Sequence, residues 1–243
     1  MQLLKKIIPK SILKRLRSFY GFLKFGIGGY FAKPKSSYSQ RAEDILVFNE
    51  SIRMKIKNGY YCDIGSYHPK FMSNTHILDK AGWTGTVIDI DEKKLLEFKR
   101  YRKNKVLCVK GAVVGSARKN QTQPVYMFNN DMGWSDINTL DLEIAKLHKK
   151  NGAGDFFEDE VEVIDINELL KSLPHINFLN IDVEGLDEQI ILSINFDLYQ
   201  PDIICFEDIK LWGGSNDIYK KLTGYGYERF FIAGESIGYS KIA

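Results

Sequence analysis

Short apolar runs along the chain alternate with longer stretches in which apolar residues recur every three or four positions. The runs have the length and composition of buried strands, and they fall at residues 59–63, 86–90, 106–109, 176–181 and 203–206. The stretches with helical spacing fall at residues 39–56, 73–81, around 95–98, at 166–173, from about 185, and at 216–222. This alternation predicts an α/β domain whose parallel sheet is wound right-handedly.

Two features extend this pattern. The apolar run at residues 106–109 is followed at once by a second one at 111–115, and we expect the third strand to continue through both. The runs at residues 227–232 and 236–240 leave room only for a short turn around Gly234, which predicts a closing antiparallel hairpin.

Residues 118–159 break the rhythm of strands and helices. The pattern predicts here an extra strand at 125–128, a polar loop at 129–135 and a polar helix at 137–148. We expect the alternation to resume with a strand at residues 161–164.

The first 35 residues differ from the rest of the chain in charge. They contain nine Lys and Arg and no Asp or Glu; because the whole chain carries +3, the remainder carries −6. Apolar residues at helical spacing interleave with these bases. They predict either a basic amphipathic helix on a membrane surface or an arm that packs on the domain or on a second subunit. With a glycine-rich linker after it, this segment predicts a basic arm over residues 1–35 and one domain over residues 36–243.

The bulk properties exclude several classes of protein. A mildly acidic domain argues against a general nucleic-acid binder. The sequence has no apolar run near the ~20 residues that cross a bilayer, and no secretory signal is recognisable. Three cysteines without a CxxC pair predict reduced core thiols rather than a catalytic or metal-binding role. We therefore expect a cytoplasmic protein, with peripheral contact to the inner face of a membrane only through the arm.

Two carboxylates stand where the first two predicted strands end. Asp63 is followed by Gly65, which would let the backbone turn tightly, and Asp89 ends the next strand. Ligands of open α/β sheets bind beyond these strand ends, and an acid after the second strand commonly binds ribose hydroxyls. The glycines of a dinucleotide motif are missing here, so an adenosine cofactor without phosphates, S-adenosylmethionine, fits better. Acids that only cap helices are the alternative, and matched positions on two strands disfavour it.

A second group of acids follows the later strands. Asp182 ends the run at 176–181 with Glu184 close behind, and the next run ends at Glu207 and Asp208. Like charges gathered at one sheet edge are unfavourable unless a cation or shared protons relieve them. Mg²⁺ or Mn²⁺ with oxygen ligands is one answer, and pairing with Lys or Arg is the other.

Histidine is the remaining candidate for proton transfer. His68 lies on the turn after the first strand, within a few residues of Asp63, so we interpret it as a general base or a ligand. A lone histidine is more often structural, and we assign no role to His148 or His175.

Five segments, in order, resemble the FkbM family of S-adenosylmethionine-dependent methyltransferases. They are Tyr38-Ser39-Gln40 with Glu43-Asp44, Asp63-Ile64-Gly65-Ser66-Tyr67-His68-Pro69, Ser73-Asn74-Thr75, Gly82-Trp83-Thr84-Gly85 and Ile181-Asp182-Val183-Glu184-Gly185. The set covers most of the chain, and any one segment alone would be a weak signal. The resemblance implies a class I methyltransferase fold: a Rossmann-like, mostly parallel seven-stranded sheet with a reversed last strand.

The resemblance also implies roles for individual residues. For the cofactor these are Gln40 and Glu43 near its methionine end, Asp63 and Gly65 in the first motif, Asp89 with Asp91 at the ribose, and Ala112 and Val113 beside the adenine. Asp182, Glu207 and Asp208 are similar in placement to the metal ligands of related metal-dependent sugar O-methyltransferases. Those enzymes carry a histidine where this chain has Glu184-Gly185, so the base becomes His68 or Glu184.

The resemblance implies O-methylation of a saccharide or a nucleotide-activated sugar, in the biosynthesis of a capsule or lipopolysaccharide. We expect the loop at 129–135, with Trp134, to line the acceptor pocket. Two alternatives stay open: a methyltransferase of a phosphorylated small molecule, and a non-catalytic module that binds a partner or a membrane. The sequence leaves a homo-oligomer open as well.

Overall fold

The computed structural model describes residues 37–102, 105–118, 120–128, 135, 137–208 and 215–242. The predicted basic arm over residues 1–35 lies outside these ranges, as does the predicted pocket-lining loop from 129 to 134 with Trp134. A separate arm, its membrane contact and the acceptor-lining role of this loop therefore stay predictions.

A seven-stranded sheet forms the centre of the molecule, in the order β3-β2-β1-β7-β8-β10-β9. Its strands are β1 (Tyr60–Ile64), β2 (Thr84–Asp89), β3 (Val106–Lys110), β7 (Phe178–Ile181), β8 (Ile203–Glu207), β9 (Tyr227–Ala233) and β10 (Ser236–Lys241). Strands β3, β2, β1, β7 and β8 pair in parallel, whereas β10 runs antiparallel to both β8 and β9. The structure confirms the predicted fold class, including the reversed last strand and the hairpin.

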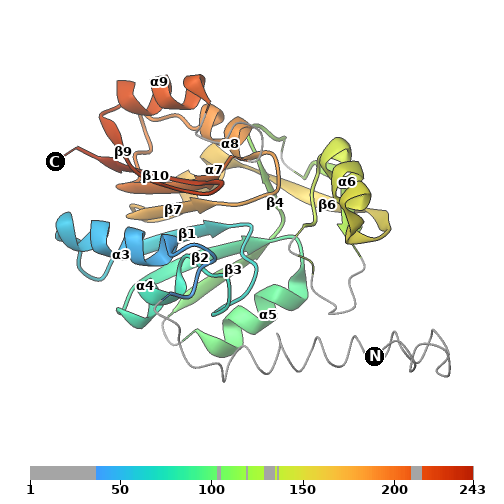
Figure 1. The fold of residues 1–243 in the computed structure, drawn as a ribbon, viewed down its shortest axis with the longest axis horizontal. Coiled ribbons are helices and arrows are strands. Elements are labelled where there is room, and N and C mark those ends of the chain that lie inside the picture. The colour runs from blue at the N-terminus through green and yellow to red at the C-terminus, as the bar shows by residue number, and fades with distance from the viewer. Residues whose placement is uncertain are drawn as a thin grey trace.

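Helices cover both faces of this sheet (Figure 1). One face carries α3 (Glu43–Arg53), α4 (His76–Lys80) and α5 (Glu92–Tyr101), and the other carries α7 (Ile166–Ser172), α8 (Asp187–Ser193) and α9 (Asn216–Gly224). Side chains of the inner strands alternate between two apolar cores, with Tyr61 and Val87 in one and Cys62 and Ile88 in the other. Burial on both faces explains why these strands read as continuous apolar runs.

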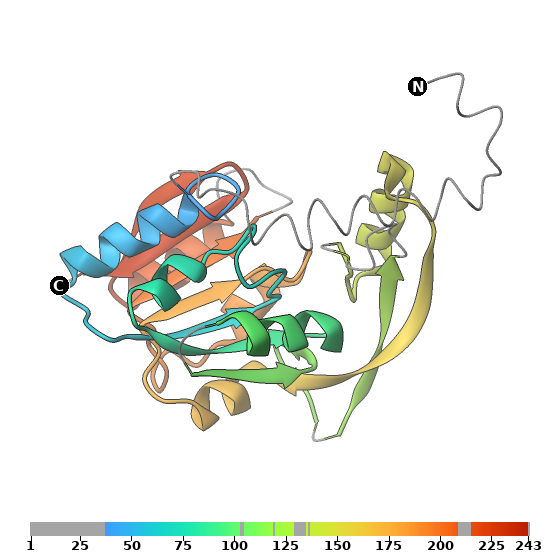
Figure 2. The same cartoon turned by 90° about the horizontal axis from the view of Figure 1, so that it is seen from below.

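A second, three-stranded sheet corrects two predictions. It consists of β4 (Ala112–Val114), β6 (Phe156–Asp165) and β5 (Thr122–Phe128), in that order, and it extends beside the main sheet (Figure 2). The run at 111–115 is therefore no continuation of β3, because the chain redirects at Gly111 and β4 pairs with β6. Residues 161–164 belong to β6 and do not resume the main sheet.

The predicted helix at 137–148 is shorter in the structure. Thr139 forms a β-bridge with Tyr126, so the helix begins only at Leu142 as α6 (Leu142–His148). Asp141 caps it, since its carboxylate accepts hydrogen bonds from the backbone N–H groups of Glu143 and Ile144. The π-helical turn η3 (Lys149–Ala153) follows α6 directly, and the chain then enters β6. Across the described ranges, every helix falls short of the length and apolarity that a bilayer crossing needs.

Candidate functional site

An open pocket lies at the carboxyl ends of β1, β2 and β7. The space between its walls, open solvent included, is about 540 Å³. Apolar walls come from Ile64, Ile88, Ala112, Val113 and Leu140, and the acidic lining comes from Asp89, Asp182 and Glu184. Ala112 and Val113 line this pocket from the second sheet, and their contact with an adenine stays a prediction.

A smaller pocket of about 270 Å³ adjoins the first one. Asp63, Tyr67, His68, Asn74 and Asn180 line it, together with Ser66, Met72 and Ser73. Gly65 and Asp182 line both pockets. The two residues therefore stand at the junction between the pockets, where groups held in one meet groups held in the other.

The turn after β1 depends on Gly65. This residue has φ +83°, and the N–H groups of Gly65 and Ser66 both donate to the carbonyl oxygen of Ile88, at 2.9 and 3.2 Å. A Cβ on Gly65 would lie 1.7 Å from the carbonyl oxygen of Asp182. The glycine is required because the ends of β1 and β7 meet there, a reason beyond the predicted approach of a ligand.

Asp63 is buried beneath this turn and is fully engaged with its neighbours. Its Oδ2 accepts a 2.6 Å hydrogen bond from the hydroxyl of Thr75, and its Oδ1 accepts a 2.9 Å bond from the side-chain amide of Asn180. The guanidinium of Arg102 donates to the same Thr75 hydroxyl at 3.0 Å. Burial raises the pKa of Asp63, and these donors oppose the shift. Asp63 therefore fixes the turn to β7 and to the start of α4.

Asp89 and Asp91 have different positions although they are two residues apart. Asp89 lines the large pocket, where its Oδ1 accepts the backbone N–H of Asp91 at 2.7 Å and its Oδ2 contacts Lys94 Nζ at 3.1 Å. The Asp91 carboxylate instead caps α5 by accepting the N–H of Lys93. The helix-capping alternative thus describes the side chain of Asp91, while Asp89 is available to a ligand.

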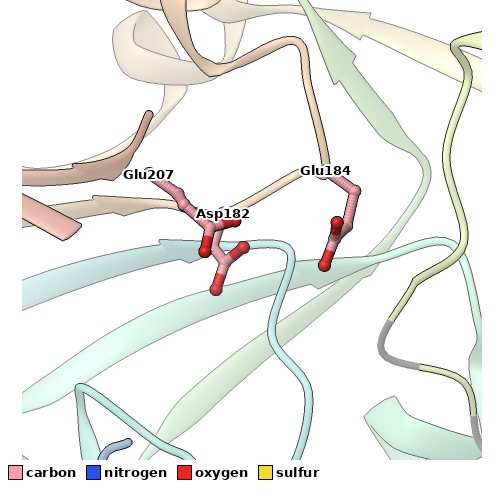
Figure 3. A group of neighbouring side chains, drawn as sticks. All are labelled: Asp182, Glu184 and Glu207. Carbon is pink, nitrogen blue, oxygen red and sulfur yellow. The ribbon is translucent and has the colours of Figure 1, made fainter. Parts of the chain in front are cut away.

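Three carboxylates gather where β7 and β8 end. Oxygens of Asp182, Glu184 and Glu207 lie within 4.8 Å of one another, and the side chains extend toward a common space (Figure 3). Among the described residues, the predicted member Asp208 is not part of this group, and Glu184 takes its place. The backbone N–H of Asp208 donates to the backbone carbonyl of Glu235. Carboxylate oxygens in this arrangement could hold a hard divalent cation.

Burial and mutual repulsion raise the pKa values of Asp182 and Glu207. Burial, and then the charges of Glu184, Asp187 and Glu235, raise the pKa of Glu207 from 4.5 to about 8. Burial and then the neighbouring carboxylates raise the pKa of Asp182 well above its usual range, and burial raises that of Asp187 to about 7. Without a bound cation, Asp187 and Glu207 therefore keep their protons up to about neutral pH, and a positive charge bound beside them would favour their ionised forms.

This cluster predicts a stability that falls with pH. A carboxyl whose pKa is raised in the folded state holds its proton more tightly than in the unfolded state, so the free energy of unfolding decreases between about pH 4.5 and about pH 8. We expect Glu207→Gln to gain stability relative to the unaltered protein across this window. Urea unfolding at about pH 5 and about pH 8.5 measures the difference.

The matched control is Glu168→Gln, whose side chain is 72% exposed on α7. Its unfolding free energy should follow that of the unaltered protein at both pH values. A Glu207→Gln profile that stays parallel to the unaltered protein would contradict the assignment of the raised pKa.

His68 is buried, and its Nδ1 accepts the backbone N–H groups of Lys70 and Phe71. Burial, followed by the charges of Arg102 and Lys70, lowers its pKa to about 4. The imidazole is thus neutral at neutral pH and is a weak proton acceptor. The contacts assign it to the shape of the turn, which favours Glu184 over His68 among the two predicted bases.

The structure adds His148, to which the sequence analysis gave no role. Its Nε2 lies 3.2 Å from Oε2 of Glu184, and the hydroxyl of Thr139 donates to the Glu184 carbonyl. Glu184 itself has φ +55°, a conformation that is uncommon for a residue other than glycine. Because His148 lies 36 positions before Glu184 along the chain and comes from a different element, no sequence spacing signals the contact.

Gln40 and Glu43 lie apart from the residues that line the two pockets. Glu43 is buried and joins α3 to β10, since it accepts the N–H of Arg41 at 2.7 Å and the hydroxyl of Ser236 at 3.2 Å. Gln40 is exposed. The expected contact of these two residues with the cofactor therefore stays a prediction.

Comparisons with solved structures find distant likenesses. A TehB-like SAM-dependent methyltransferase from Corynebacterium glutamicum is 12% identical, with 92% of this chain and 97% of that chain covered and a TM-score of 0.45. An O-methyltransferase from Bacillus cereus in complex with SAH is 12% identical, with coverages of 97% and 93% and a TM-score of 0.42. A putative RNA methyltransferase from Pyrococcus horikoshii is 11% identical, with coverages of 87% and 92% and a TM-score of 0.41.

None of the curated proteins matches this chain. The methyltransferase FkbM domain matches residues 63–229, which include both pockets and every strand of the parallel part of the sheet beyond the first residues of β1. The chain is therefore a member of the FkbM family of S-adenosylmethionine-dependent methyltransferases.

Proposed function

We propose that this protein transfers the methyl group of S-adenosylmethionine to a hydroxyl of a saccharide or a nucleotide-activated sugar. The observation that supports the proposal is the junction at Gly65 and Asp182, where a pocket with apolar walls and acidic residues adjoins a second pocket and a cluster of carboxylates. Methyl transfer requires two bound molecules with their reacting atoms close together and in line.

The residues of the large pocket fit the cofactor. Apolar side chains from Ile88, Val113 and Leu140 offer walls for an adenine, and the carboxylate of Asp89 offers acceptors for ribose hydroxyls. Acidic side chains from Asp182 and Glu184 complete the lining. A cofactor that carries positive charge favours the ionised form of carboxyl groups beside it, whereas carboxylates repel a pyrophosphate. S-adenosylmethionine brings to this site an electrophilic methyl group on a sulfonium.

The acidic cluster provides what the acceptor hydroxyl needs. Glu184 is the group that we assign to accept the proton of this hydroxyl. Its Oε2 lies 3.2 Å from Nε2 of His148. Asp182 lies at the junction and orients the hydroxyl. The three carboxylates fit Mg²⁺ or Mn²⁺, which would lower the pKa of a hydroxyl bound to it. Protein side chains then exclude water and hold the acceptor in line with the methyl group.

Labelled S-adenosylmethionine and a panel of nucleotide sugars test the proposal. We expect label to reach at least one sugar, and we expect a chelator to reduce the transfer and added Mg²⁺ or Mn²⁺ to restore it. Transfer that a chelator leaves unchanged would remove the metal and keep the methyltransferase. Label that reaches only phosphorylated small molecules would replace the sugar acceptor, and a protein that does not bind S-adenosylhomocysteine would contradict the proposal.

A further inference from the structure

One lysine, Lys94, lines the large pocket, and the proposed function gives it no role. Lys94 lies on α5, and its ammonium contacts the Asp89 carboxylate at 3.1 Å, with side-chain exposures of 5% for both residues. The ammonium also lies 5.6 Å from the centre of the Tyr67 ring, on the turn after β1. Lysine is almost never buried without a partner, so this arrangement depends on Asp89.

The contacts leave Asp89 with the acceptor capacity that a ribose needs. An ionised carboxylate offers about four acceptor positions, two on each oxygen. The backbone N–H of Asp91 occupies one position on Oδ1, and Lys94 occupies one on Oδ2. Each oxygen keeps one position, and two neighbouring ribose hydroxyls are two donors at matching distance.

The charges around Asp89 also favour a role for Lys94. Burial raises the pKa of Asp89, and the ammonium of Lys94 is the largest of the opposing influences; the Asp91 carboxylate acts with burial. Asp182 and Glu184 line the same pocket and are acidic as well, so neither provides a positive charge. Among the charged groups described around Asp89, Lys94 is thus the one that favours the ionised form by its charge.

We propose that Lys94 is a positioning residue, which holds Asp89 ionised and in a single orientation so that it accepts both ribose hydroxyls of the cofactor. The inference rests on the proposed use of S-adenosylmethionine. It assigns to α5 a direct part in cofactor affinity, through a side chain that does not itself have to touch the cofactor.

Calorimetric titration with S-adenosylhomocysteine tests the role of Lys94. We expect Lys94→Met to weaken binding roughly tenfold or more, because a buried carboxylate loses its charged donor. The matched control is Lys93→Met on the same helix, whose side chain is exposed and whose backbone N–H remains, and it should bind like the unaltered protein. Lys94→Gln, which keeps a donor but not the charge, serves if Lys94→Met does not fold.

Two further readouts separate positioning from general stability. In the Asp89→Asn background, adding Lys94→Met should change the affinity less than about twofold, because the interaction partner is already gone. In the single variant, the loss relative to Lys93→Met should be larger at about pH 6 than at about pH 9, since an unpaired Asp89 takes up a proton. The ratio to Lys93→Met cancels the effects of pH that the two variants share.

Each outcome decides between the two proposals. If the unaltered protein does not bind S-adenosylhomocysteine, the proposed function fails. If it binds and Lys94→Met binds equally well, or loses the same affinity with and without Asp89, the positioning role of Lys94 is overturned while the proposed function stands. Tighter binding by Lys94→Met would show that the lysine competes with the ribose, and it would overturn the inference as well.

Discussion

Replacing Gly65 with alanine is expected to lower the free energy of unfolding by about 3 kcal/mol or more, because two penalties add at this position. A residue other than glycine is unfavourable at φ +83°, and the new Cβ would meet the backbone carbonyl of Asp182 at 1.7 Å. Relief of the clash must separate the ends of β1 and β7, since a backbone atom cannot rotate away as a side chain does. Both pockets include this junction, so we also expect binding of S-adenosylhomocysteine to be lost.

Gly226 provides the control for this substitution. Its φ of +79° is nearly the same, but a Cβ there would have no heavy atom within 4 Å. Gly226→Ala should therefore show only the conformational penalty, about 1–2 kcal/mol, and should keep its affinity for S-adenosylhomocysteine. Urea unfolding of the two variants measures the difference. Equal losses of stability would mean that the contact between β1 and β7 is unimportant.

Asp182→Asn is expected to slow methyl transfer by about 10²-fold, the loss typical when reacting atoms are misplaced, because Asp182 is assigned to orient the acceptor hydroxyl. The side chain follows the end of β7 and lines both pockets, and its carboxyl group belongs to the cluster with Glu184 and Glu207. The substitution keeps nearly the same shape, so binding of S-adenosylhomocysteine should change only a few-fold. Transfer to the acceptor identified in the sugar panel, measured at saturating cofactor, gives the rate.

The matched control is again Glu168→Gln. Glu168 is an exposed residue on α7 that lines neither pocket. Its transfer rate should equal that of the unaltered protein. Full activity of Asp182→Asn would contradict the placement of the acceptor at the junction. A loss of affinity as large as the loss of rate would assign Asp182 to cofactor binding instead of to the transfer.

The strands of the main sheet were predictable because their signal is local. Continuous apolar runs follow from burial on both faces, and an acid that closes such a run is placed at the carboxyl edge by the parallel direction of the strands. Asp63, Asp89 and Asp182 therefore lie at one edge of the sheet, as the sequence analysis predicted. Local patterning also indicated the hairpin of β9 and β10.

No local signal in the sequence indicates which strands pair with each other in a sheet. The apolar run of β4 reads as a continuation of β3, and that of β6 reads as another strand of the main sheet, because periodicity does not say which strand lies alongside. The turn at Gly111 and the register of β4 with β6 direct these runs to a second sheet. Similarly, Glu184 rather than Asp208 completes the acidic cluster, since oxygens of Asp182, Glu184 and Glu207 lie within 4.8 Å of one another.

Lys94 is another residue whose role is visible only in the tertiary structure. On the chain it follows Lys93, and the two look like the solvated face of an amphipathic helix; in the structure one is exposed and the other is buried against Asp89. The sequence by itself determined the element types, the parallel order of acids at one edge and the family, because these depend on periodicity and on motifs. Only the tertiary structure shows that Glu184 lies beside Asp182, that Lys94 pairs with Asp89 and that Gly65 packs against the backbone after β7. These contacts depend on the direction of each side chain and on the packing of neighbouring strands, which periodicity and motifs do not indicate.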